Sequence, residues 1–421
     1  MIYTKAEIEE FDKQIKELLD RKLIRKSFSP FSSPAFMVMN EAEKKRKKAR
    51  MVINYKRLNH FTKSDSYFLP NKEVLINLVK NKSFYSKFDC TSGFWQIKMK
   101  DDSIQYTTFS APQGHYEWLV MPFGLKNAPS IYQRKMDNIF SKYRDFMVVY
   151  VDDILICSNT EEDHRKHLLV FAKLCKDNGI ALSERKAIIE KKEIKFLGLK
   201  LSAAGIKLQP HISRKILEFP DKLDNRNQIE KFLGCLNYAE GFIPDLAKKK
   251  HEIQKLLRKN NTKGWNSKHT DIVVSLKEEC KTLPELRLPD DKDNLIVQTD
   301  ASDLYWSAIL KTDLNEICRY TSGTFSQAEV NYTTHEKELL GVIKGIRKFS
   351  LFLLQKPFVV HTDNTQIQSL IQNKLPNTPQ YRRLNRWQAF LSHYNFKIEH
   401  IRGTDNFLAD FLSRNIEFGN S

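Results

Sequence analysis

Two adjacent aspartates, Asp152 and Asp153, interrupt an otherwise apolar run, MVVYVDDILICS, at positions 147–158. The apolar and partly β-branched residues on both sides favour two short strands, so the acids are predicted at the turn of a β-hairpin. Two neighbouring carboxylates suppress each other's ionisation unless a cation lies between them. Taken alone, the pair is typical of a solvated turn, because aspartate is a common turn residue.

A third aspartate, Asp89, ends another strand-like segment in the run SKFDCTSGFWQIKM. One carboxylate on one strand and a pair on a neighbouring hairpin supply the hard oxygen ligands that two Mg²⁺ ions need. Other coordination positions would stay open for substrate phosphates and water. The three acids therefore predict a two-metal site that acts on phosphates.

The overall composition limits the possible functions. The chain has 421 residues, of which 41% are hydrophobic, enough for several packed domains. Lys and Arg number 69 against 51 Asp and Glu, and the net charge of +18 suits a polyanionic partner such as nucleic acid. No apolar run is long enough for a transmembrane segment, and the acidic N-terminal stretch does not resemble a signal peptide. We therefore expect an intracellular protein with no membrane partner.

The six cysteines are scattered, with no spacing typical of zinc ligands, which indicates reduced core thiols. A basic run, KKRKK at 44–48, is typical of a solvated loop but could also bind phosphates.

The elements that must position the acids are predicted to form an α+β block. Apolar spacing indicates a helix in the first 26 residues. A strand, a turn at Gly93 and a second strand are expected from 83 to 109, and helices from 127 to about 143 and from 161 to 178. Because strands and helices mix without a regular βαβ repeat, we expect an antiparallel sheet with helices on one face.

A second set of elements follows the first block. Helical periodicity between 229 and 260 predicts a helical subdomain with a positive face. The proline-bearing stretch KTLPELRLPDDKDN is the expected linker. Beyond it a helix is predicted from 334 to about 352, together with five strand-like segments: NLIVQTDAS, YWSAILKT, ICRYTSGTF, FVVHTDN and NFKIEHI.

Several motifs in order resemble one enzyme family. FDCTSGFWQIKM, APQGHYEWLVMPFGLKNAPSIYQRKMD and YVDDILICS are similar to the palm of a reverse transcriptase of the long-terminal-repeat type, above all that of plant pararetroviruses, the caulimovirus group. FLGCLNYAEGFIPDL resembles the thumb of these enzymes. TDAS, NYTTHEKELLGVIKGI, HTDN and HIRGTDNFLADFLSR follow the order of their ribonuclease H motifs. The resemblance covers almost the whole chain.

The resemblance implies an α+β architecture, a right-hand polymerase followed by an α/β ribonuclease H domain with a mixed five-stranded sheet. The expected domains are fingers and palm at 1–205, thumb and short connection at 206–283, and ribonuclease H at 284–421. Little room remains for a full retroviral connection domain.

The resemblance assigns roles to polymerase residues. Asp89 and Asp152 would hold both metals, with Asp153 in support. The fingers lysine that contacts the triphosphate cannot be placed within the basic run at 44–48.

Substrate-binding residues are implied in the same way. Phe94 matches the aromatic gate that clashes with a 2′-hydroxyl, and Arg50 matches the fingers arginine that binds the incoming triphosphate. Gln113 and Gly114 match the template-side turn. Phe123 stands where retroviral enzymes carry a glutamine near the nucleotide, a substitution shared by related retroelements and pararetroviruses.

In the second block the resemblance implies a ribonuclease H site made of four metal-binding carboxylates and a histidine that assists turnover: Asp300, Glu338, Asp363, Asp410 and His400. Glu336 lies two residues before Glu338, so the two side chains point about 200° apart on a helix and cannot share one role. Thr333 and Glu336 fit a capping box, which makes Glu336 structural and Glu338 the ligand.

The resulting hypothesis is an RNA- and DNA-dependent DNA polymerase with ribonuclease H activity that copies a viral RNA into double-stranded DNA. Two Mg²⁺ per active site are expected, with Mn²⁺ as a substitute. The expected partners are RNA and DNA template-primers, RNA·DNA hybrid and deoxynucleoside triphosphates, and a monomer is favoured over a dimer. Alternatives are a catalytically silent subunit that binds nucleic acid or a viral coat, and an RNA replicase.

The expected location is the host cytoplasm and the viral particle. Because no protease-like Asp-Thr/Ser-Gly pair and no integrase signature is found, the sequence indicates one product, or one excised piece, of a polyprotein.

Overall fold

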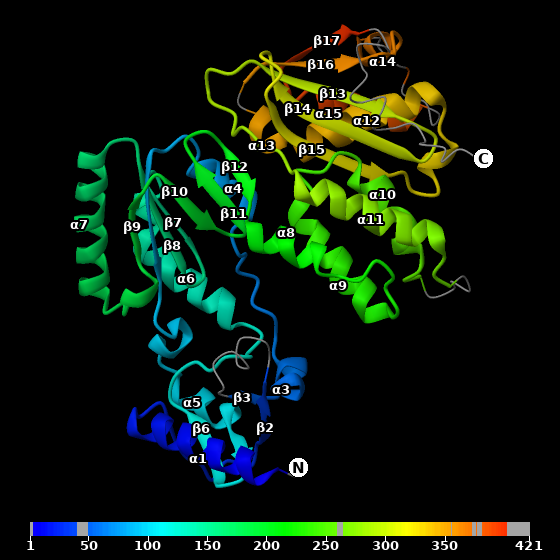
Figure 1. The fold of residues 1–421 in the computed structure, drawn as a ribbon. Coiled ribbons are helices and arrows are strands. Elements are labelled where there is room, and N and C mark those ends of the chain that lie inside the picture. Colours follow the sequence, from blue (N-terminus) through cyan, green and yellow to red (C-terminus); the bar gives the residue numbers. More distant parts are fainter. Residues whose placement is uncertain are drawn as a thin grey trace. The chain divides into compact units, whose positions relative to one another are not determined.

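The computed structural model describes residues 3–39, 49–258, 264–354, 356–372, 376 and 381–401 (Figure 1). The chain divides into two compact units, Met1–Lys192 and Glu193–Ser421, which are described separately. The three domain ranges expected from the sequence stay a prediction.

The N-terminal part of the first unit is a five-stranded sheet packed against a helix. Helix α1 (Lys5–Asp20) begins at a capping box between Thr4 and Glu7 and buries Phe11, Ile15 and Leu18. These side chains join the core of a sheet in the order β1-β6-β5-β2-β3. The strands are β1 (Ile24–Lys26), β2 (Ser33–Val38), β3 (Arg50–Ile53), β5 (Phe109–Ala111) and β6 (Gly114–Trp118). Short helices α3 (Lys56–Phe61), α4 (Lys72–Leu78) and α5 (Asp101–Ile104) connect this sheet to the next one.

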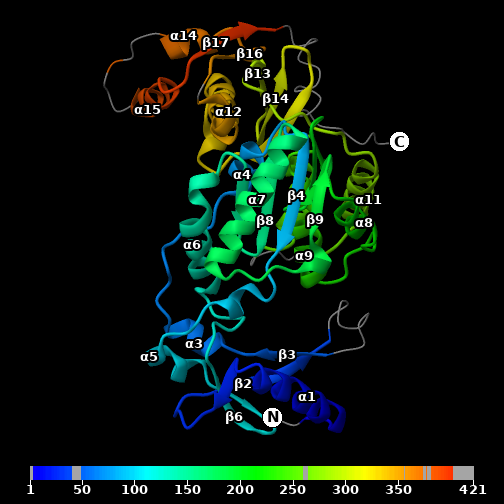
Figure 2. The same cartoon turned by 90° about the vertical axis from the view of Figure 1, so that its left-hand side faces the viewer.

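The rest of the first unit is a four-stranded antiparallel sheet in the order β7-β8-β4-β9. Its strands and two long helices are β4 (Phe84–Asp89), β7 (Met147–Tyr150), β8 (Asp153–Ser158), β9 (Ile188–Lys191), α6 (Ala128–Phe140) and α7 (Glu161–Asn178). Side chains of both helices join the sheet in one apolar core, and Figure 2 shows α7 in front of β4 and β8. The predicted hairpin, antiparallel sheet and two helices are confirmed.

One element prediction in this unit was wrong. No continuous strand follows Gly93; the chain instead forms a 3₁₀ turn, η1 (Gly93–Gln96), and the short helix α5. The chain leaves β4 through Ser92, whose left-handed backbone (φ 48°) ends the extended conformation. In the place of the predicted strand, Lys98 forms an isolated antiparallel β-bridge with Val120.

The second unit begins with a small sheet, β10-β11-β12, which is followed by helices. These elements are β10 (Glu193–Phe196), β11 (Leu199–Ser202), β12 (Ile206–Leu208), α8 (Pro210–Leu217), α9 (Arg226–Leu236), α10 (Leu246–Lys255) and α11 (Ser267–Lys281). The predicted helical subdomain is therefore present. No helix in the described part of the chain is long and apolar enough to cross a membrane.

A mixed five-stranded sheet forms the rest of this unit, in the order β15-β14-β13-β16-β17. Strands β13, β14 and β15 pair antiparallel, whereas β13, β16 and β17 pair parallel. The elements are β13 (Leu295–Ala301), β14 (Tyr305–Thr312), β15 (Ile317–Thr324), α12 (Thr334–Lys348), α13 (Ser350–Leu353), β16 (Phe358–Thr362), α14 (Ile367–Gln372), α15 (Arg382–Leu391) and β17 (Phe396–His400). The predicted mixed sheet is confirmed, and the single helix predicted from 334 to 352 is divided at Phe349.

Helix α12 lies very close to this sheet because its inner face lacks side-chain bulk. A methyl group added at Gly345 would lie 2.8 Å from the Cβ of Ala308, and one added at Gly341 would lie 3.5 Å from the Cβ of Ala301.

Helix α12 begins at the predicted capping box between Thr333 and Glu336, which confirms that prediction.

Candidate active sites

The turn between β7 and β8 carries the acidic pair. Tyr150 lies opposite Asp153, so Val151 and Asp152 form a two-residue turn. Val151 has a left-handed backbone (φ 51°), and a left-handed residue at the first position only is typical of a type II′ turn. Beside this hairpin, β4 places Asp89 directly opposite Asp153, and the Cys90 N–H donates to the carbonyl of Asp152 at 3.2 Å. The three predicted acids thus gather at one end of the sheet.

The three carboxylates differ in their surroundings. Lys186 pairs with Asp89 and Lys87 pairs with Asp153, each at 2.8 Å. Asp152 has a buried Oδ1 with no hydrogen-bond partner among the described residues. Burial, followed by the charges of Asp89 and Asp153, raises the pKa of Asp152 to about 6. A bound cation would offset both the burial of Asp152 and its repulsion from Asp89 and Asp153. The cluster is therefore suited to hold a divalent metal ion.

Two residues near these acids have roles that the sequence did not reveal. Lys186 lies 97 positions after Asp89, and nothing in its local pattern signals the ion pair. Gly93 is predicted only as a turn residue, but a methyl group there would lie 2.1 Å from Oδ1 of Asp152 and 2.8 Å from the Tyr132 hydroxyl. Glycine is therefore needed so that Asp152 can approach the start of η1.

A cavity of about 620 Å³ opens in front of the acids. Its walls bring together residues from distant segments of the first unit, among them Asp89, Asp152, Arg50, Trp95, Phe123, Gly124 and Lys186. The Arg50 guanidinium lies 5.2 Å from the centre of the Phe123 ring. A charged, planar donor facing a carboxylate cluster across such a cavity can bind the phosphates of a nucleotide whose metal ions the acids hold.

The other predicted substrate-binding residues do not line this cavity. Gln113 and Gly114 lie at the turn between β5 and β6, where the Gln113 amide donates to the carbonyl of Ile8 at 3.2 Å. Phe94 is 9% exposed and packs against Phe123 and Tyr132, with ring centres 5.1 and 5.6 Å apart. Their predicted roles at the template and at the sugar stay predictions.

Phe94→Val tests the role of the aromatic ring at the sugar. We expect the ratio of ribonucleotide to deoxynucleotide incorporation to rise, because a smaller side chain behind Phe123 leaves space for a 2′-hydroxyl. Steady-state efficiencies for matched nucleotide pairs measure this ratio. An unchanged ratio, with a loss of stability of about 1 to 3 kcal/mol, would mean that Phe94 is only a core residue.

The second carboxylate cluster lies in the mixed sheet of the second unit. One carboxylate oxygen from each of Asp300, Glu338 and Asp363 lies within 4.8 Å of the other two. Asp300 is the next-to-last residue of β13 and Asp363 follows β16, so parallel pairing of these strands brings both acids to one edge, where α12 adds Glu338. A cavity of about 550 Å³ opens over the three acids, which could hold a divalent cation.

The structure separates Glu336 from this cluster. Its carboxylate accepts a hydrogen bond from the Thr333 N–H at 3.0 Å and forms an ion pair with Arg383. Burial opposes ionisation of Glu336, but the hydrogen bonds from Arg383 and Thr333 hold its pKa below the usual value. His400, at the end of β17, donates from Nε2 to the carbonyl of Asp363 at 3.0 Å. Asp410 and the basic run at 44–48 lie outside the described residues.

Comparisons with known proteins place the chain in a known enzyme class. Residues 42–201 match the family model for reverse transcriptase (RNA-dependent DNA polymerase), and residues 290–394 match that for the RNase H-like domain found in reverse transcriptase. The structure of the foamy viral protease-reverse transcriptase in complex with dsDNA is similar, with a TM-score of 0.80 at 22% identity over 96% of this chain and 84% of that one. The same foamy viral protein in complex with RNA/DNA hybrid has a TM-score of 0.79 over 95% of this chain and 54% of that one. The right-hand polymerase fold followed by a ribonuclease H fold is thus confirmed.

Sequence relatives narrow the class further. The chain is 48% identical over its whole length to the enzymatic polyprotein of Cauliflower mosaic virus (strain Strasbourg), of which it spans 63%. It is 45% identical over 99% of its length to that of Carnation etched ring virus, spanning 64%, and 40% identical over 98% to that of Cestrum yellow leaf curling virus, spanning 67%. The chain belongs to the caulimovirus reverse transcriptase/ribonuclease H family, as the sequence motifs predicted.

Proposed function

We propose that this chain is an RNA- and DNA-dependent DNA polymerase that also cleaves the RNA strand of RNA·DNA hybrids. The observation that supports it most is the presence of one carboxylate cluster in each unit, each at an open cavity. The two activities belong together, because copying RNA produces a hybrid whose RNA strand blocks synthesis of the second DNA strand.

In the polymerase site, Asp89 and Asp152 would hold two Mg²⁺ ions, with Mn²⁺ as a substitute. The unpartnered Oδ1 of Asp152 fits such a ligand role. When bound, the ions activate the primer 3′-hydroxyl and neutralise charge on the α-phosphate and the departing pyrophosphate. Arg50 would donate to the triphosphate oxygens, Phe94 would act as the aromatic gate beneath the sugar, and Phe123 would stand near the nucleotide. Lys186 adds positive charge beside Asp89, on the same wall of the cavity.

In the ribonuclease site, Asp300, Glu338 and Asp363 would hold the metal ions, with Asp410 as the fourth ligand. When bound, the ions activate a water molecule and stabilise the leaving 3′-oxygen. His400 holds a proton at Nε2 next to Asp363, where it can assist departure of the product.

The proposed macromolecular partners are RNA and DNA template-primers and RNA·DNA hybrid, which is supported by the foamy viral structures in complex with RNA/DNA hybrid and with dsDNA. A groove of about 790 Å³ near β2 and α3 supports this proposal, since Lys56, Arg57, Lys126 and His60 line it beside the 74% exposed Phe61. No acidic side chain is among the described residues that line it. Basic side chains next to an exposed ring suit a single strand, which offers phosphates and base faces.

Binding of a template-primer is expected to be largely electrostatic. Replacing Lys56, Arg57 and Lys126 by glutamine should reduce the log-log slope of affinity against salt by up to about three units, one for each phosphate that is no longer neutralised. The matched control replaces three exposed lysines of α7, Lys166, Lys173 and Lys176, by glutamine and should leave the slope near that of the parent. Equal slopes for the two triple variants would contradict a role of the groove.

Primer extension on an RNA template, with hybrid cleavage measured in the same preparation, tests the proposed function. Extension with deoxynucleoside triphosphates in Mg²⁺ or Mn²⁺ supports it, whereas binding without extension would indicate a silent subunit.

Light scattering with and without hybrid tests the proposed monomeric state. The host cytoplasm and the viral particle are the proposed sites of action.

A further inference from the structure

The turn that carries Asp152 holds a residue in an unfavourable conformation. Val151 has φ 51°, which β-branched residues rarely adopt, and glycine is usual at the first position of a type II′ turn. Such strain persists only where surrounding groups fix the backbone. The question is which groups fix this turn.

One buried glutamine binds the backbone on both sides of the strained residue. Gln133, from α6, is 0% exposed. Its Oε1 accepts the Val151 N–H at 2.7 Å, and its Nε2 donates to the carbonyl of Val149 at 3.1 Å. The second hydrogen on Nε2 is donated to Oδ1 of Asp137 at 3.1 Å. The carboxamide has only one orientation that satisfies all three partners, because its oxygen must face the N–H and its nitrogen the two acceptors.

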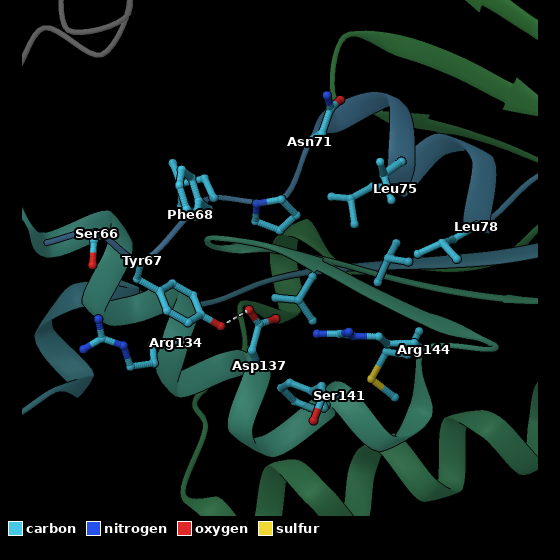
Figure 3. A pocket seen from close by; sticks show the side chains of 17 residues that line it. Ser66, Tyr67, Phe68, Asn71, Leu75, Leu78, Arg134, Asp137, Ser141 and Arg144 are labelled. Carbon is cyan, nitrogen blue, oxygen red and sulfur yellow. Dashed lines mark hydrogen bonds between the residues drawn. The ribbon is translucent and has the colours of Figure 1, made fainter. Parts of the chain in front are cut away.

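A second set of contacts fixes Asp137. Its Oδ2 accepts the Tyr67 hydroxyl at 2.5 Å, as the dashed line in Figure 3 shows. Tyr67 is held in turn by Asp65, whose Oδ1 accepts the Tyr67 N–H at 2.9 Å and pairs with Arg134 at 2.5 Å. Tyr67 and Asp137 lie on the wall of a cavity of about 750 Å³ that β7 also lines. Hydrogen bonds therefore run without a break from this cavity to the turn that carries Asp152.

We propose that Gln133 is a positioning residue for the polymerase site. It fixes the backbone of Val149 and Val151 so that the carboxylate of Asp152 faces Asp89, and Asp137 and Tyr67 fix its carboxamide. Gln133 is not a catalytic residue, since it is buried and would contact neither nucleotide nor metal. The inference rests on the proposed function, because it assumes that Asp89 and Asp152 hold metal ions.

Gln133→Met tests this role, because methionine has a similar length but neither donates to nor accepts from these partners. We expect the kcat for nucleotide addition to fall about 10- to 100-fold, the effect of a small displacement of a catalytic group. The Mg²⁺ concentration at half-maximal rate should rise several-fold, and a chain-terminated primer should need correspondingly more Mg²⁺ to retain the next nucleotide. Hybrid cleavage and metal-free template-primer affinity should stay within about twofold of the parent, since neither depends on this turn.

A double-mutant cycle separates positioning from general packing. Glycine adopts φ 51° without strain, so the loss caused by Gln133→Met should be much smaller in a Val151→Gly background. Equal losses in both backgrounds, or parent-like kcat and Mg²⁺ dependence in Gln133→Met, would overturn the proposal. If Gln133→Met does not fold, Tyr67→Phe decides: a raised Mg²⁺ requirement supports the proposal and a parent-like requirement overturns it. An inactive parent enzyme would instead refute the proposed function.

Discussion

Asp152→Asn is expected to abolish nucleotide addition and to leave hybrid cleavage intact. The buried Oδ1 of Asp152 has no hydrogen-bond partner among the described residues, which suits the metal-ligand role proposed for it. Because burial and the neighbouring acids raise the pKa of Asp152 to about 6, a bound cation would also favour the ionised carboxylate in mildly acidic solution. A neutral amide cannot supply that charge, and the rate should fall by a factor on the order of 10³ or more.

Primer extension and hybrid cleavage, measured on the same preparation of Asp152→Asn, give the two readouts. The second cluster lies in the other unit and supplies its own acids, so cleavage serves as an internal control for folding and hybrid binding. Asp145→Asn, which alters an exposed acid of the same unit, should retain both activities. Substantial extension by Asp152→Asn would refute the assignment of the polymerase site.

Glu338→Gln should lower RNA cleavage by orders of magnitude, whereas Glu336→Gln should keep it. Glu338 is 7% exposed, and its carboxylate lies within 4.8 Å of oxygen atoms of both Asp300 and Asp363. The carboxylate of Glu336 instead accepts a hydrogen bond from Thr333 and forms an ion pair with Arg383 at the start of the helix. A glutamine at position 336 can still accept the capping hydrogen bond, and Glu336→Ala, which cannot, should cost at most about 1 kcal/mol of stability.

RNA cleavage and thermal unfolding of the two glutamine variants check this pair. The variants share one chemical change on one helix, which makes each the control for the other. Glu338→Gln should also unfold near the temperature of the parent, because it relieves repulsion within an acidic cluster. An active Glu338→Gln protein, or a folded but inactive Glu336→Gln protein, would show that the two roles are reversed.

Local sequence patterns determined the elements that carry the sites. Apolar, partly β-branched residues on both sides of Asp152 and Asp153 could form strands on each side of a tight turn, and the structure has that hairpin. Thr333 and Glu336 predicted the start of α12, because a capping box involves residues only three positions apart. The order of the motifs predicted the family, which the sequence relatives confirm. Such features depend on neighbours along the chain or on motif order, so they can be recognised without coordinates.

Interactions between distant segments were decided only by the tertiary structure. The ion pair between Lys186 and Asp89, the packing of Arg50 on Phe123, and the hydrogen bonds that join Gln133 to Val149 and Val151 have no local signature. Periodicity tells which face of an element is buried, but not which partner that face meets. Phe94 is an example: its motif did not reveal that its ring packs against Phe123 and Tyr132, while its role at the sugar stays a prediction. The same reason explains Gly93, since a side chain there is excluded by Asp152, from the turn between β7 and β8, and by Tyr132, from α6.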